Sequence, residues 1–135
     1  MFAEREIMES SIELLAAIAF LMIGASHIAQ PRAWAEFFIL MRRQGVAGVF
    51  VVALMTLPMG VIIVTFHQTW TGLPALLTAI GWGFCLKSAV YLAYPRAGLA
   101  TLARITVDRP GEFVMAGVLL LVISGICWFS WLFPS

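Results

Sequence analysis

Long stretches without a charged residue alternate with short charged segments along this chain of 135 residues. The charge-free stretches are residues 14–31, 44–86 and 113–135. The hydrocarbon core of a bilayer takes about 20 helical residues to cross, so the middle stretch is long enough for two crossings and a turn. The pattern therefore predicts four transmembrane helices, at residues 11–30, 45–67, 73–94 and 113–133.

Two segments between these spans have a different pattern. In residues 32–43 the large apolar side chains recur at helical spacing, and they are Trp34, Phe37, Phe38 and Met41. Charged residues fill other positions, which is typical of an amphipathic helix lying in the membrane surface. Residues 96–110 follow the third span in the same way and are predicted to be a second interfacial segment. Such a segment is either a simple anchor or part of a lipid- or substrate-binding site.

Helix-breaking residues support these limits. Pro31 and Pro95 follow the first and third spans, and the residue before a proline disfavours helical backbone. Residues 68–72 have the polar composition of a turn. Pro58 lies in the middle of the second span and predicts a kink, static or hinge-like, with Thr56 as the candidate to bond the freed carbonyl group.

The composition agrees with a membrane protein. Hydrophobic residues make up 62% of the chain and charged residues 11%, whereas a soluble domain has about 25% charged residues. A chain this small could not bury so much apolar surface in water. The net charge of +1 and the absence of a basic stripe exclude a nucleic-acid partner. We therefore predict an all-α integral membrane protein with one domain, residues 1–135.

The arginine residues predict the orientation. One face, here called side A, carries most of them: Arg32, Arg42, Arg43, Arg96, Arg104 and Arg109. The opposite face, side B, has only Arg5, together with both termini and the turn at 68–72. The positive-inside rule makes side A cytoplasmic and places both termini outside the cytoplasm of a cell membrane. The acidic N-terminus is unlike a cleaved signal peptide, so the first span is expected to be retained.

A possible internal repeat relates the two halves of the chain. The sequence Pro-Arg-Ala occurs at residues 31–33 and again 64 residues later, at 95–97. The pattern Arg-x-Gly occurs at 43–45 and at 109–111. Equivalent spans would run in the same direction, which predicts a parallel two-fold repeat with two membrane helices in each half. Chance or shared interface chemistry is the alternative.

Lys87 is the polar residue in most need of an explanation. A lysine near the membrane centre costs about 2.5 kcal/mol or more, and such residues are usually paired or functional. No Asp or Glu is predicted at the same depth. The side chain could extend towards side A along Tyr91 and Tyr94, could meet an anionic lipid, substrate or partner subunit, or could carry a proton.

A ligand-binding pocket is predicted near side A. His27 ends the first span beside Ser26 and Gln30, and Lys87 and Tyr91 lie on the same side in the third span. These five residues would line a polar pocket between the two spans. The alternative for His27 is a local hydrogen bond at a helix end, where the dipole favours it.

Secondary candidates lie near side B. His67 and Trp70 have positions typical of the aromatic belt at an interface. Glu13 has capping-box spacing from Ser10, and its membrane position is similar to that of the glutamate of small multidrug transporters.

No cofactor or metal site is predicted. His27 and His67 are expected near opposite faces and could not bind one haem together. Cys85 and Cys127 are expected at different depths, so no disulfide is predicted.

The sequence leaves two main hypotheses for the function. One is a transporter or carrier of a small anionic or lipid-like ligand that uses the side A pocket. The other is an accessory or structural subunit of a larger membrane complex, with lipids and a homo-oligomer or partner subunit as its contacts. A membrane enzyme is less favoured, since no catalytic set of residues shares one depth. The order of elements is similar to that of DoxX-like four-helix membrane proteins, which also have a surface segment after the first span.

Overall fold

The computed structural model describes residues 1–133 and contains six helices and no strand in this range. The helices are α1 (Phe2–Ala29), α2 (Pro31–Arg43), α3 (Val46–Phe66), α4 (Pro74–Ala93), α5 (Pro95–Leu102) and α6 (Gly111–Leu132). Four of them, α1, α3, α4 and α6, are long and apolar enough to cross a membrane. The prediction of an all-helical, multi-pass membrane protein is confirmed at this level.

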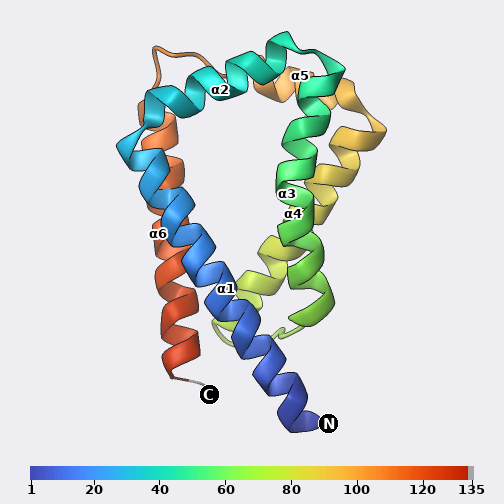
Figure 1. Ribbon diagram of the computed structural model, residues 1–135, viewed down its shortest axis with the longest axis vertical. Coiled ribbons are helices and arrows are strands. Elements are labelled where there is room, and N and C mark those ends of the chain that lie inside the picture. Colours follow the sequence, from blue (N-terminus) through green and yellow to red (C-terminus); the bar gives the residue numbers. More distant parts are fainter. Residues whose placement is uncertain (134–135) are drawn as a thin grey trace.

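The four long helices form two pairs (Figure 1). α1 packs most extensively against α6, and α3 packs most extensively against α4. The short helices α2 and α5 lie at the end of the molecule remote from the two termini. At its N-terminal end α1 leans towards the turn between α3 and α4, where it makes hydrogen bonds to residues of that turn.

Small residues bring α1 and α6 into close contact. A Cβ atom added to Gly24 would lie 2.9 Å from the carbonyl oxygen of Gly117, and one added to Gly117 would lie 2.7 Å from that of Gly24. The Ser124 hydroxyl donates a hydrogen bond to the Ala17 carbonyl at 2.7 Å. Small residues and serine hydroxyls at such contacts are how membrane helices pack without a hydrophobic driving force between them.

The second pair is built in a similar way. Gly81 lies against Ile63, and the Ser88 hydroxyl donates to the Ala53 carbonyl at 3.1 Å. Other small residues of α4 make no comparable contact, because Ala79 is exposed and a Cβ at Gly83 would meet no atom within 4 Å.

The first helix begins earlier than the span predicted at residues 11–30. α1 begins at Phe2 with Met1 as its N-cap and has no side-chain cap. The residues before Ser10 include Glu, Arg, Met and Ala, which are good helix formers, so the helix extends about two turns further towards the N-terminus. Ser10 and Glu13 are consequently interior helix residues and form no capping box.

The proline predictions are confirmed at both junctions. Gln30 and Tyr94 leave the helical conformation, with φ of −132° and −136°, and Pro31 and Pro95 then open α2 and α5. Gly45 follows α2 with a φ of +63°, a left-handed conformation that suits glycine.

Pro58 lies inside α3, as predicted, but Thr56 does not take the role expected for it. The carbonyl freed by Pro58 is that of Leu54, one turn earlier. The Thr56 hydroxyl instead donates to the Ala53 carbonyl at 3.2 Å and lies 2.9 Å from the Ser88 hydroxyl. Thr56 therefore links α3 to α4.

Candidate functional site

Three buried polar side chains meet where the two helix pairs come together. His67 ends α3 and is 0% exposed. Its Nε2 atom lies 3.3 Å from Oε1 of Glu13 in α1, and its Nδ1 atom lies 2.9 Å from Oγ1 of Thr78 in α4. Glu13 is 7% exposed and Thr78 is fully buried. Two titratable groups thus share one hydrogen-bonded cluster at the junction of α1, α3 and α4.

The cluster can hold a variable number of protons without moving its heavy atoms. Thr78 has one hydroxyl hydrogen and three acceptors within reach, the Thr69 carbonyl at 2.8 Å, Nδ1 of His67 at 2.9 Å and the His67 carbonyl at 3.4 Å. When the hydroxyl points to Nδ1, the Nε2–H group donates to an ionised Glu13. When the Thr78 hydroxyl points to the Thr69 carbonyl instead, the Nδ1–H group of His67 donates to the hydroxyl oxygen. A second proton must then lie between Nε2 of His67 and the carboxyl group of Glu13.

A polar cavity borders this cluster. It has a volume of about 270 Å³ and is lined by Glu6, Glu9, Ser10, Glu13, Thr69, Pro74 and Ser130. Glu9 accepts a hydrogen bond from the Thr69 hydroxyl at 3.1 Å and lies 3.7 Å from the Arg5 guanidinium. The cavity is therefore rich in carboxylates, and one of them belongs to the buried Glu13–His67–Thr78 cluster.

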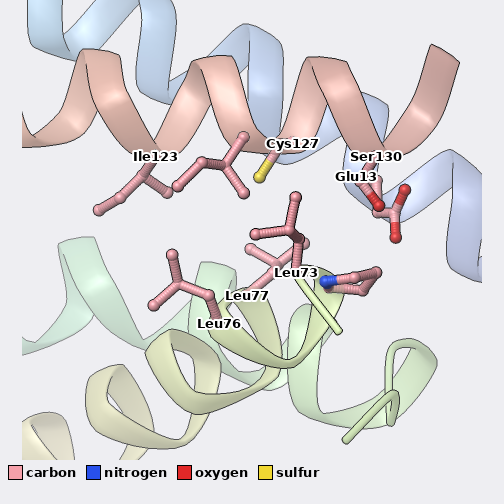
Figure 2. A pocket seen from close by; sticks show the side chains of 9 residues that line it. Glu13, Leu73, Leu76, Leu77, Ile123, Cys127 and Ser130 are labelled. Atoms are coloured by element: carbon pink, nitrogen blue, oxygen red, sulfur yellow. The ribbon is translucent and has the colours of Figure 1, made fainter. Parts of the chain in front are cut away.

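Glu13 also borders a narrow apolar crevice (Figure 2). The side chains of Ile123 and Cys127 from α6 face Leu76 and Leu77 of α4 across it. Figure 2 shows the Ser130 side chain next to Glu13 at one end of this crevice. A molecule held at Glu13 would contact carboxylates on one side and apolar side chains on the other.

His27, predicted to be in the side A pocket, is buried in an aromatic cluster instead. Its Nδ1 atom lies 2.8 Å from the Ile23 carbonyl, and its ring stacks on Trp34 at 4.1 Å between ring centres. Trp34 donates a hydrogen bond to Ser26 at 3.0 Å, and Phe113 flanks the histidine from α6. The local hydrogen bond predicted as the alternative for His27 is present.

Lys87 lies apart from this cluster. It is exposed on α4, and its Nζ atom is 5.5 Å from the centre of the Tyr91 ring. It forms no salt bridge within residues 1–133. Because α1 pairs with α6 and α4 pairs with α3, the structure divides the predicted pocket residues between the two helix pairs.

The remaining candidates are also separated. Ser26 and Gln30 line an open groove of about 350 Å³ beside Trp34 and Met55. Trp70 is exposed and donates to the side chain of Gln68 in the same turn.

Glu13 and His67 were predicted only as separate secondary candidates, and their contact was not predicted. His67 was interpreted as an interfacial residue, whereas it is fully buried. Thr78 and Ser130 were not identified at all. The available signal was depth, because all four residues lie near the side B ends of their spans.

No group of three or more His, Cys, Asp or Glu side chains in residues 1–133 could hold a metal ion. Cys85 and Cys127 are free, as predicted. The chain matches no protein-family model, no curated protein and no solved structure.

Proposed function

We propose that this protein is a small membrane carrier that translocates protons and that the Glu13–His67 pair is its proton-binding site. The observation that supports this most directly is the contact between two titratable side chains, one 0% and the other 10% exposed, beside a cavity of about 270 Å³. Histidine is the side chain that most readily changes charge between pH 5 and 8. Intramembrane ionisable residues usually mark substrate paths or proton relays.

The position of the pair suggests how protonation would be coupled to movement. Glu13 belongs to the α1–α6 pair, and His67 belongs to the α3–α4 pair. A hydrogen bond between them depends on the proton that the two groups share, so a change of protonation alters a contact that holds the pairs together. The polar groups around these two residues include Thr78 from α4, Cys127 and Ser130 from α6, and Glu6 and Glu9 of α1 in the adjoining cavity.

Proton flux into liposomes tests the proposal. The protein is reconstituted with an internal pH-sensitive dye, and an acid pulse is applied while valinomycin and potassium balance the charge. Wild-type protein should dissipate the gradient, and E13Q and H67N should not. E36Q changes an exposed glutamate of α2 and should behave as wild type. Wild-type flux in E13Q would overturn the proposal.

We also propose the orientation and the interfacial helices predicted from the sequence. The arginine-rich segments of α2 and α5 would face the cytoplasm, and the carboxylate-lined cavity would then open on the opposite side. Support for an interfacial α2 comes from its aromatic residues, since Phe38 stacks on Phe113 at 5.9 Å and Trp34 on His27. Part of its apolar face is thereby covered by the chain itself.

The proposed parallel repeat has support from equivalent contacts. His27 packs on Phe113, and the residues 64 positions from each, Tyr91 and Val49, belong to one core cluster. The Gly24–Gly117 contact corresponds in the same way to the hydrogen bond between Ser88 and Ala53. The α1–α6 pair would thus be the counterpart of the α4–α3 pair.

An accessory subunit is the second candidate function, and Lys87 favours it. The side chain is exposed on α4 without a carboxylate partner in residues 1–133, as expected if an acidic residue of a neighbouring subunit completes the pair. K87M should then abolish a larger complex in native gels of gently solubilised membranes. An unchanged complex with K87M would count against this function.

A further inference from the structure

We infer that the groove beneath α2 binds one phospholipid with an anionic headgroup, which places an acyl chain in the groove and the headgroup at Arg32. The inference rests on the proposed interfacial position of α2 and is independent of the proposed proton site. It adds a lipid-binding site built from residues other than Glu13 and His67.

The groove lies between the two helix pairs at the α2 end of the molecule. Its lining comes from the end of α1, from α2 and from α3, and consists of Ser26, Gln30, Ala33, Trp34, Phe37 and Met55. Figure 1 shows that the two pairs move apart towards this end. Nearer side B the pairs are in contact, since the rings of Phe20 in α1 and Phe84 in α4 lie 6.2 Å apart between their centres. The groove is therefore a space between the pairs that the chain itself does not fill.

The groove has the depth and the volume of an acyl-chain site. Met55 lies nine residues after Val46, the first residue of α3, which is about 14 Å along the helix axis at about 1.5 Å per residue. Half of the hydrocarbon core is about 15 Å thick, so the groove extends from the interfacial α2 almost to the middle of the bilayer. Its volume of about 350 Å³ is within the range of about 300–1,000 Å³ for small-molecule sites. An acyl chain would supply the dispersion contacts that an empty groove lacks.

The polar groups of the groove lie towards α2. Gln30 is exposed at the junction of α1 and α2, and its amide can donate to and accept from a headgroup. The Ser26 hydroxyl, about one helical turn deeper, accepts a hydrogen bond from the Trp34 indole at 3.0 Å. The rest of the lining is apolar or aromatic. A site that is polar at one end and apolar at the other matches a phospholipid better than a free polar solute.

The charges next to the groove favour an anionic headgroup. Arg32 lies between Gln30 and Ala33 in the sequence, is exposed, and forms no salt bridge within residues 1–133. α2 carries three arginines against one acidic residue, Glu36, which also has no ion-pair partner in that range. Arg42 already donates to carbonyl groups at the end of α5. Arg32 is therefore the arginine available to a headgroup at this groove, and one arginine near the surface favours anionic lipid by about fivefold.

Native mass spectrometry of the full chain tests the inference. The protein is released from nanodiscs that contain equal amounts of anionic phosphatidylglycerol and zwitterionic phosphatidylcholine. Wild-type chains should retain one lipid, and this lipid should be phosphatidylglycerol at least about fivefold more often. A33W should lose it, because Ala33 is exposed in the groove and an indole there fills the space. A79W changes an exposed alanine of α4 outside the groove and should retain the lipid.

A second pair of variants tests the headgroup contact. R32M should still retain a lipid, but the preference for phosphatidylglycerol should fall by about fivefold. R109M removes an exposed arginine that already lies 3.6 Å from Glu112, and it should leave the preference unchanged.

Several results would overturn the inference. These are no retained lipid in the wild type, equal retention of the two lipids by the wild type, or wild-type retention by a folded A33W variant. A lipid-free dimer that A33W dissociates would also overturn it, because a second copy of the chain would then fill the groove. Should A33W fail to fold, R32M decides, since Arg32 is exposed and an unchanged lipid preference would refute the headgroup contact. The proton-flux assay needs no anionic lipid, so the loss of this inference would leave the proposed function standing.

Discussion

Single glycines decide how closely α1 and α6 approach each other. Gly24 and Gly117 lie backbone to backbone, and a Cβ on either would lie within 3.0 Å of the carbonyl oxygen of the other. A backbone atom cannot move aside as a flexible side chain can. Gly83 is also in a membrane-spanning helix, but a Cβ there would meet no atom within 4 Å.

These environments predict opposite effects for the same substitution. G24A should lower the free energy of unfolding by about 1–3 kcal/mol, the usual cost of overpacking. G83A should leave it unchanged or raise it by up to about 1 kcal/mol, because alanine favours the helix. Thermal unfolding of the detergent-solubilised variants measures both. If G24A were as stable as G83A, the close contact between α1 and α6 would be refuted.

The candidate site shows how far single residues could be predicted from sequence. Glu13 and His67 were recognised as unusual because polar residues are rare in apolar spans. Their contact was missed because it depends on which helices pair, and the amphipathic pattern is too weak in these nearly uniformly apolar spans to show that. Lys87 and His27 were predicted on the same side of the membrane, yet they belong to different helix pairs.

At the scale of elements, α2 and α5 are joined by one side chain. The guanidinium of Arg42 donates hydrogen bonds to the carbonyls of Leu102, Ala103 and Ile105 at 3.4, 3.3 and 3.3 Å. The Leu102 carbonyl lies at the end of α5 and the other two follow it. Carbonyl groups at a helix end have no N–H partner within the helix. Arg42 thus stabilises the end of α5 and fixes it against α2.

R42M should therefore loosen the segment that follows α5. Hydrogen bonds to charged groups contribute about 1.5–3 kcal/mol, so amide exchange in residues 103–110 should become at least about tenfold faster. Hydrogen–deuterium exchange with mass spectrometry measures this. R43M removes an exposed neighbour that makes no such contact and should leave the exchange unchanged. Equal exchange in the two variants would show that Arg42 does not secure α5.

The helices themselves were largely predictable, because length, charge-free runs and prolines determine where they begin and end. The exception is the start of α1, where residues 2–10 continue the helix although they are mostly polar. The distribution of charge therefore did not predict where the helix begins, since a helix can continue through charged residues beyond an apolar segment.

At the scale of the whole molecule, the two helix pairs meet through polar groups near the termini and through α2 and α5 at the other end. The proposed direction of proton entry depends on which end faces the cytoplasm. The carboxylate-lined cavity lies at the end with the termini, because Glu6 and Glu9 are in the first turns of α1. Orientation therefore decides from which compartment the Glu13–His67 pair would take up a proton.

Site-directed labelling determines this orientation. Thr71 lies in the turn between α3 and α4, and Asp108 lies between α5 and α6; both are exposed. With Cys85 and Cys127 replaced by alanine, T71C should react with a membrane-impermeant maleimide in intact cells. D108C should react only after permeabilisation, because its neighbouring arginines favour the cytoplasmic side. The reverse labelling pattern would place the cavity on the cytoplasmic side, and a proton would then enter the pair from the cytoplasm.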